Sequence, residues 1–120
     1  MRRYLRSFIY ALRGIGFALK SEKNFRFEIV TAVVAVIAGL LLPLSALERS
    51  LIFLSIALVL AVELANTAFE RVVDILKPRI HPYARVIKDM MAGAVLLTTL
   101  TAIAIGITIF LPHILIVFGF

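Results

Sequence analysis

The chain has 120 residues, enough for one domain, and 62% of them are hydrophobic. Its mean hydropathy of +1.07 lies well above that of a typical water-soluble domain, which excludes an ordinary soluble fold and indicates an integral membrane protein. The net charge of +6 comes from basic residues that flank apolar runs, so it favours contact with anionic lipid over nucleic acid. Cysteine is absent, which excludes disulfides and thiolate catalysis.

Residues 1–24 are predicted to form an amphipathic helix that lies on the membrane surface. Its apolar side chains recur at helical spacing, and its basic side chains occupy another face. The apolar positions are Leu5, Phe8, Ile9, Leu12, Ile15 and Leu19, and the basic ones are Arg6, Arg13 and Lys20. This arrangement is typical of an interfacial helix, although a helix packed against protein has the same pattern. No compact apolar core with a cleavage site follows the arginines, so we expect no signal peptide.

Three membrane-spanning helices are predicted, at about 27–47, 50–76 and 84–112. The first contains IVTAVVAVIAGLLLPLSAL, which is uncharged and long enough to cross a hydrocarbon core of roughly 30 Å. Glu48 and Arg49 are expected in a short turn after it. Pro78 and Pro82 are expected to interrupt the chain between the second and third spans. We therefore predict an all-α membrane protein with one surface helix and three transmembrane helices.

The distribution of basic residues predicts the orientation in the membrane. Seven of the 13 Lys and Arg lie at or before Arg26, and five surround the break between the second and third spans. Arg49 alone lies between the first two spans, and the C-terminal tail has none. Because cytoplasmic loops carry the excess of Lys and Arg, we expect the N-terminus in the cytoplasm and the C-terminus outside.

Glu63 is the first candidate for chemistry, because it follows thirteen uncharged residues on a predicted membrane helix. An ionisable group at that depth is costly and is a functional candidate by default. Asn66, Glu70 and Asp74 follow at +3, +7 and +11, which places all four on one helical face. Carboxylate oxygens of this kind suit Mg²⁺, which usually shares them with phosphates.

Two further polar groups are predicted at the same membrane level. Glu22 and Glu28 lie between the surface helix and the first span, and His81, Lys88 and Asp89 open the third. Acidic and basic groups gathered there could hold a polyphosphate with its metal. The alternative is structural: Glu63 as a hydrogen-bonded carboxyl between helices, and the others as boundary charges. The sequence contains neither GxxxxGK[ST] nor GxGxxG, so no phosphate-binding loop is expected.

The segment ELANTAFERVVD at 63–74 resembles the E-x-x-N-[ST]-[AS]-[IF]-E-x-x-x-D signature of the prokaryotic diacylglycerol kinase and undecaprenol kinase family. The upstream Glu22-x-x-x-Arg26-x-Glu28, the Lys88-Asp89 pair, and the N-terminal helix with Arg3 and Tyr10 are similar to that family as well. The resemblance extends from about residue 3 to 112. It implies a homotrimeric membrane enzyme of the bacterial cytoplasmic membrane that transfers the γ-phosphoryl group of MgATP to a lipid hydroxyl, with active sites between protomers.

The resemblance also implies roles for individual residues. Glu63 would be the general base, supported by Asn66, with Lys88 as a further catalytic group. Glu22 and Glu70 would hold Mg²⁺. The nucleotide site would be lined by Arg3, Tyr10, Glu22, Glu70, Asp74, His81, Lys88 and Asp89. The lipid would lie near Arg26, Glu28 and Glu63.

The lipid substrate is less well defined by the sequence. The stretch HPYARVIKDMMAGAV at 81–95 resembles the undecaprenol kinase branch more than the diacylglycerol kinase branch. We expect undecaprenol, with diacylglycerol as the alternative acceptor. A small proton-coupled transporter would account for Glu63 but not for the other polar groups, and a structural subunit would need none of them.

Overall fold

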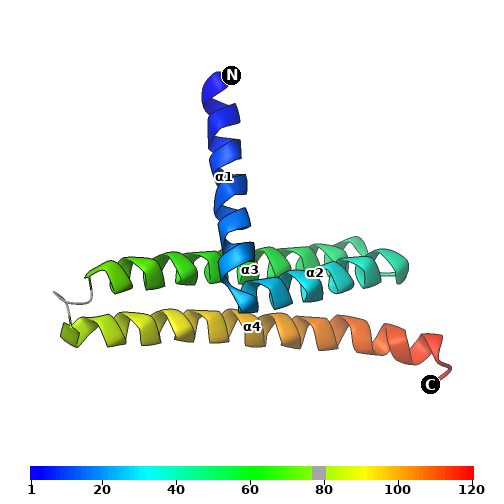
Figure 1. The fold of residues 1–120 in the computed structure, drawn as a ribbon. Coiled ribbons are helices and arrows are strands. Elements are labelled where there is room, and N and C mark those ends of the chain that lie inside the picture. The colour runs from blue at the N-terminus through cyan, green and yellow to red at the C-terminus, as the bar shows by residue number, and fades with distance from the viewer. Residues whose placement is uncertain (77–80) are drawn as a thin grey trace.

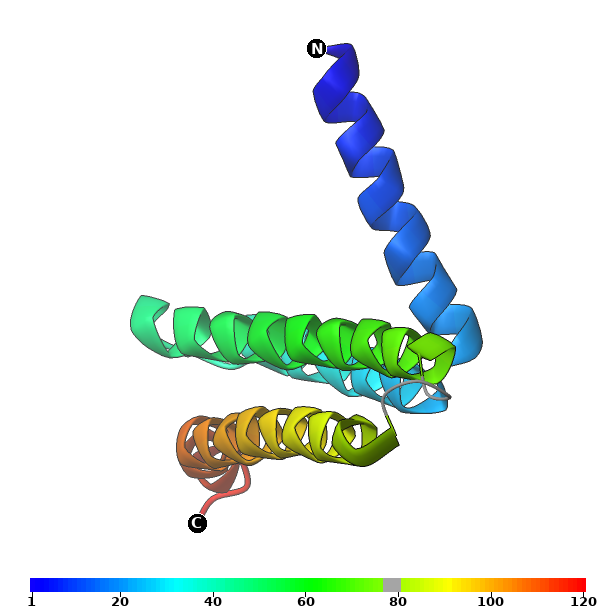
Figure 2. The ribbon, with the colours of Figure 1, turned by 90° about the vertical axis from the view of Figure 1, so that its left-hand side faces the viewer.

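The computed structural model describes residues 1–76 and 81–120, and the regular structure in these two stretches is α-helical. Its four helices are α1 (Arg2–Ser21), α2 (Lys23–Leu41), α3 (Ala46–Leu76) and α4 (His81–Val117). Helices α2, α3 and α4 run alongside one another, whereas α1 stands away from them (Figures 1 and 2). The last three are long and apolar enough to cross a membrane. The prediction of an all-helical chain with three long apolar helices is confirmed.

The connection between α2 and α3 differs from the prediction. α2 ends at Leu41, and α3 begins at Ala46, so Glu48 and Arg49 lie in its first turn and the predicted loop assignment is wrong. Leu42 is extended because the following Pro43 disfavours helical backbone before it. The Ser45 Oγ accepts from the Glu48 amide at 3.1 Å, and the Glu48 Oε2 accepts from the Ser45 amide at 2.8 Å. This reciprocal capping box starts α3.

Three other predicted boundaries also move. α1 ends at Ser21 rather than 24, and α2 starts directly after Glu22, which has extended backbone. α4 continues to Val117, through Pro112, beyond the predicted end at 112. A proline removes one helical hydrogen bond, but the next residue, His113, places its ring Nδ1 2.8 Å from the Ile109 carbonyl oxygen. That contact adds a hydrogen bond to the turn that contains the proline.

Helix α3 is the scaffold of the fold, because it packs against each of the other three helices. Among the described residues, α2 and α4 share no close packing and approach each other only across α3. Near the start of α3, Leu44, Ile52 and Ile109 form a buried apolar cluster. Phe25, with 1% of its surface exposed, is the largest fully buried side chain and lies close after the α1–α2 junction. Buried packing is therefore present both near the start of α3 and beside the α1–α2 junction.

The α1–α2 junction is a single residue, Glu22. Its amide donates to the Ala18 carbonyl at 2.9 Å, and the Arg26 Nη1 donates to the carbonyls of Leu19 and Lys20 at 2.9 and 3.0 Å. The last carbonyls of a helix have no partner within the helix, so Arg26 satisfies two that α1 leaves open. This contact fixes the point at which the chain changes direction. Along the rest of α1 most side chains are exposed.

Candidate active site

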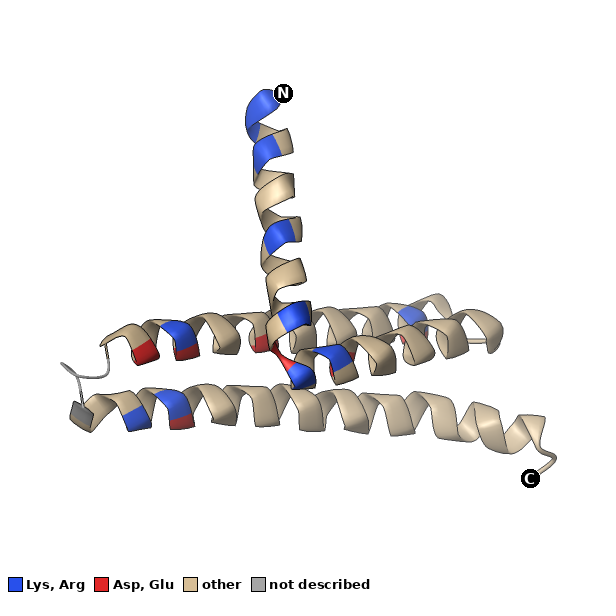
Figure 3. Cartoon of the chain, in the orientation of Figure 1, with Lys and Arg blue, Asp and Glu red and all other residues tan. Residues whose placement is uncertain are grey.

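Most charged residues of the helical layer lie in one part of it, and a smaller group lies near the α2–α3 connection (Figure 3). We call this part the acidic half and define it by Glu22, Glu28, Glu63, Glu70 and Asp74. Among the described residues of α4, Asp89 is the last Asp, Glu, Lys or Arg, and the helix beyond it is mostly apolar. The carboxylates predicted from the sequence therefore occupy one region of the fold. This is expected when consecutive membrane helices run in opposite directions, because the end of one helix then lies beside the start of the next.

Glu63 is the buried centre of the acidic half, with 4% of its surface exposed. Asn66, Glu70 and Glu22 are close enough to act on its carboxyl electrostatically. Glu28 of α2 faces it as well. Asn66 is one turn away on α3, so the helix itself sets this pair. Several carboxylates around one buried carboxylate repel one another, and a cation placed among them would relieve that repulsion.

Glu28 connects the acidic half with an apolar groove. The groove has a volume of about 530 Å³ and runs between α2, α3 and α4, and Glu28 is its charged lining residue. The Glu28 Oε2 is buried and accepts no hydrogen bond, and the same is true of the Thr67 hydroxyl of α3. Buried polar atoms are nearly always hydrogen-bonded, so these two are available to a polar group brought in from outside.

Lys88 and Asp74 join α4 to the end of α3. The Lys88 Nζ donates to the Asp74 Oδ1 at 2.7 Å, and the two side chains are 37% and 52% exposed. Glu70 is also close enough to Lys88 to act on it electrostatically. Asp89, the next residue after Lys88, is exposed. The structure thus brings Lys88, Asp74 and Glu70 together, as the sequence predicts, and leaves an ammonium group where a phosphate could meet it.

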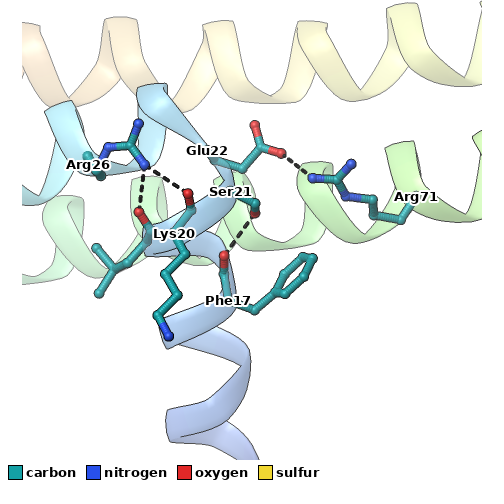
Figure 4. A network of polar contacts seen from close by, with 7 residues as sticks. Phe17, Lys20, Ser21, Glu22, Arg26 and Arg71 are labelled. Atoms are coloured by element: carbon teal, nitrogen blue, oxygen red, sulfur yellow. Dashed lines mark hydrogen bonds and ion pairs between the residues drawn. The ribbon is translucent and has the colours of Figure 1, made fainter.

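Glu22 is held by a residue that the sequence analysis did not assign to the site. The Arg71 Nη2 of α3 donates to the Glu22 Oε1 at 3.0 Å, and the Arg71 guanidinium lies 5.6 Å from the centre of the Phe17 ring (Figure 4). With side chains 49% and 24% exposed, this ion pair is worth about 0–1 kcal/mol. From the sequence alone, Arg71 could be interpreted as a charge at the membrane boundary. Its partner Glu22 lies 49 residues away in the sequence, so no local pattern indicates the pair.

The residues fit Mg²⁺ through their chemistry. Among the described residues, no group of three or more His, Asp or Glu side chains is arranged to hold a metal. Mg²⁺ does not require such a group, because it is usually bound by one or two carboxylates together with water and substrate phosphates. Glu22 and Glu70 both lie close enough to Glu63 to act on it electrostatically, so two carboxylates of the kind that Mg²⁺ prefers lie in the same part of the fold.

Two predicted nucleotide-binding residues are not brought into this group. Arg3 and Tyr10 are exposed on α1, and Arg13 of the same helix lies 5.8 Å from the centre of the Tyr10 ring. Arg3 is 18 residues from Ser21, roughly 27 Å along the helix axis. The side chain of His81 lies outside the described part of the chain. The predicted lipid residue Arg26 contacts the backbone of α1, so its guanidinium is occupied within this chain.

The opposite end of the layer contains polar contacts that the sequence analysis did not predict. We call it the capped end and define it by Ser45, Glu48, Arg49 and His113. The Arg49 Nε donates to the Gly39 carbonyl at 3.1 Å, and the His113 Nε2 lies 3.9 Å from the Glu48 Oε2. Ser45 and Glu48 have the S-x-x-E spacing of a capping box, a signal that was available in the sequence.

Buried and clustered carboxylates on apolar helices, with a lysine beside them, are features of a membrane-embedded phosphotransferase. Comparison with known proteins supports this class. The family model described as prokaryotic diacylglycerol kinase matches residues 9–110. The chain belongs to this family of lipid kinases.

Individual relatives carry two different names. The chain is 40% identical to undecaprenol kinase of Bacillus subtilis over 93% of its own length and 91% of that protein. It is 39% identical to diacylglycerol kinase of Synechocystis over 91% of its length, but this covers only 63% of the relative. It is 35% identical to diacylglycerol kinase of Escherichia coli over 78% of its length and 77% of that enzyme. ATP is the phosphoryl donor that kinase membership implies.

Proposed function

We propose that the chain phosphorylates the hydroxyl group of a membrane lipid, with ATP as donor, at the acidic half of its helical layer. The observation that carries this proposal is the buried Glu63 among Asn66, Glu22 and Glu70 on apolar helices. Such a group is costly in a membrane and needs a partner, and a lipid hydroxyl is a partner that arrives from the membrane itself. The Lys88–Asp74 pair lies toward the α3 end, where a water-soluble donor has access.

In the proposed step the lipid oxygen attacks the γ-phosphorus of ATP, and the bond between that phosphorus and the bridging oxygen of ADP breaks. Glu63 takes the hydroxyl proton as the new bond forms, and Asn66 holds the Glu63 carboxyl in position. Lys88 offsets charge on the phosphoryl oxygens. Bound Mg²⁺ would neutralise phosphate charge, with Glu22 and Glu70 as its protein ligands. Asp74 and Asp89 would contact the nucleotide beside Lys88.

We propose undecaprenol as the acceptor and diacylglycerol as the alternative. The match to the B. subtilis undecaprenol kinase covers nearly all of both chains, and the stretch at 81–95 resembles that branch. Glu28, at the apolar groove with an unpaired buried oxygen, is suited to the hydroxyl of a long-chain lipid. Arg26 is proposed at the edge of the lipid site.

We further propose a homotrimer with active sites shared between protomers. Within one chain, α1 points away from the acidic half and carries Arg3 and Tyr10 with it (Figure 1). These side chains could complete a nucleotide site only on a neighbouring protomer, and His81 is proposed for the same site. In this assembly α1 would lie on the cytoplasmic surface of the bacterial inner membrane, with the C-terminus outside, because most basic residues flank that side.

The test is a phosphorylation assay with purified protein and radiolabelled ATP. Undecaprenol, diacylglycerol and ceramide are offered in parallel mixed micelles, and labelled lipid is separated by chromatography. We expect labelled product with the first two and the faster rate with undecaprenol. A faster rate with diacylglycerol would reverse the substrate assignment. No labelled lipid from any of them would reject the kinase proposal and favour a transporter or a structural subunit.

A further inference from the structure

The Glu22 carboxylate has two partners that compete for it, the Arg71 guanidinium and the proposed Mg²⁺ ion. It is proposed to bind Mg²⁺, yet its Oε1 already accepts a hydrogen bond from Arg71 at 3.0 Å. A guanidinium at that distance repels a divalent cation placed on the same oxygen. Arg71 is therefore a competitor for Glu22 as long as the pair is closed.

Arg71 is held at this position by a second contact, with Phe17 of α1. The guanidinium lies 5.6 Å from the ring centre, within the range of a cation–π interaction. Phe17 lies near the end of α1 and Glu22 is the α1–α2 junction, so one arginine of α3 contacts both α1 and the junction (Figure 4). Arg26 cannot replace it, because its guanidinium is bound to the carbonyls of Leu19 and Lys20.

Both contacts are weak enough to be reversed. Half of the Arg71 side-chain surface is exposed, so solvent screens the pair and the guanidinium has space to move. A divalent cation that arrives with nucleotide phosphates offers Glu22 a stronger partner and offers Arg71 phosphate oxygens, which bind arginine well.

We propose that Arg71 is a latch on the metal site: it closes on Glu22 and Phe17 when no nucleotide is bound and opens when the metal–nucleotide complex arrives. The latch disfavours binding of bare metal and couples the direction of α1 to occupancy of the site. The proposal rests on the proposed metal role of Glu22. It is specific to Arg71, a positioning residue that acts through Glu22.

The latch predicts that a variant without Arg71 binds metal more tightly than wild type, whereas most substitutions at a binding site weaken binding. Mn²⁺ serves as the probe, and its free concentration is read from the electron paramagnetic resonance signal of hydrated Mn²⁺. The full chain is placed in nanodiscs of zwitterionic lipid without nucleotide. We expect Arg71→Gln to tighten Mn²⁺ binding by about three- to tenfold relative to wild type. General damage to the fold would weaken binding instead.

Two further variants make the result specific. Arg71→Lys keeps the positive charge near Glu22, and its Mn²⁺ affinity should stay within about twofold of wild type. Arg13→Gln removes the same charge from the other arginine–aromatic contact of α1 and should leave Mn²⁺ affinity unchanged. Unchanged or weaker Mn²⁺ binding by Arg71→Gln, or equal tightening by Arg13→Gln, would overturn the latch.

A latch that fails this test is distinguishable from a failure of the proposed function. Lipid phosphorylation by the wild-type protein depends on the catalytic residues and is measured in a separate assay. Labelled lipid together with unchanged Mn²⁺ binding would reject only the latch. The absence of labelled lipid would reject the kinase itself.

Discussion

The polar side chains of the capped end are hydrogen-bonded within the described part of the chain, whereas some of those in the acidic half are not. At the capped end, Ser45 and Glu48 satisfy each other's amides, and Arg49 holds the Gly39 carbonyl. These groups lie beside the buried Leu44–Ile52–Ile109 cluster. In the acidic half, carboxylates face one another and two buried polar oxygens accept or donate no hydrogen bond.

The difference shows how one helix can serve two purposes. Near its start, α3 uses polar groups to close the backbone hydrogen bonds of a tight connection, which stabilises the fold. Further along, it carries charges that the fold alone does not neutralise. Such groups reduce stability and persist in proteins mainly at functional sites. Variants at the capped end should therefore change stability, and variants in the acidic half should change activity.

The largest effect is expected from Glu63→Gln. The amide cannot take the hydroxyl proton, so phosphoryl transfer should fall by about 10²–10⁴-fold, while the protein folds and binds MgATP. The measurement is radiolabelled lipid formed from saturating ATP and lipid. Glu48→Gln makes the same chemical change at the capped end and should leave the turnover rate near that of wild type. Equal losses of turnover in Glu63→Gln and Glu48→Gln would contradict the assignment of activity to the acidic half and of stability to the capped end.

Arg49→Ala should give the largest effect at the capped end. It leaves the Gly39 carbonyl, at a buried glycine, without its charged donor, and a hydrogen bond of this type is worth about 1.5–3 kcal/mol. The midpoint of thermal unfolding in detergent should fall, while the rate of lipid phosphorylation at low temperature stays close to wild type. A variant with normal thermal stability would show that this hydrogen bond contributes little.

Glu70→Ala should act on the metal dependence of the reaction. Loss of one of two carboxylate ligands should raise the Mg²⁺ concentration needed for half-maximal activity by about tenfold, and high Mg²⁺ should restore part of the rate. Glu22→Ala should act in the same direction. The measurement is a Mg²⁺ titration at fixed ATP. A titration curve that coincides with that of wild type would remove these residues from the metal site.

Ser45→Ala is expected to have the smallest effect of the four. It removes the side-chain half of the capping box at the start of α3, which should cost about 1 kcal/mol of stability. Activity in the lipid assay should be unchanged. Ser50→Ala is a suitable control, because the Ser50 hydroxyl bonds to the Ala46 carbonyl within the helix and caps nothing. Equal unfolding midpoints for the two variants would contradict a stabilising role for the cap.

Much of this fold could be predicted from the sequence, because long apolar runs and helical spacing are local signals. The three apolar helices and the polar face from Glu63 to Asp74 follow from them directly. The start of α3 was predicted four residues too late, since charge at Glu48 and Arg49 was interpreted as a turn. The capping spacing of Ser45 and Glu48 was the better guide.

Contacts between distant parts of the chain were not predictable. The Arg71–Glu22 pair joins residues 49 positions apart, and its formation depends on how α1 meets α3. The approach of His113 to Glu48 likewise depends on how α4 lies against α3. Arg26 was predicted near the lipid, whereas its nearest partners are backbone carbonyls of α1. The roles of the site residues in catalysis stay predictions.

The length of α3 has a consequence for where two kinds of substrate can meet. Its 31 residues extend about 46 Å, whereas the hydrocarbon core of a bilayer is about 30 Å thick. Measured from Ala46, Glu63 lies about 26 Å along the axis and Asp74 about 42 Å. The length of α3 therefore sets the depth of its side chains in the bilayer. With the capped end at one membrane interface, Glu63 would lie just inside the opposite interface, and Asp74 would lie outside the hydrocarbon core. In the proposed reaction, a lipid headgroup and a water-soluble donor would share one helix face, each without leaving its own phase. In a thicker bilayer, α3 would be too short to bring Asp74 out of the hydrocarbon core. We therefore expect the phosphorylation rate to fall as the acyl chains of the surrounding lipids become longer.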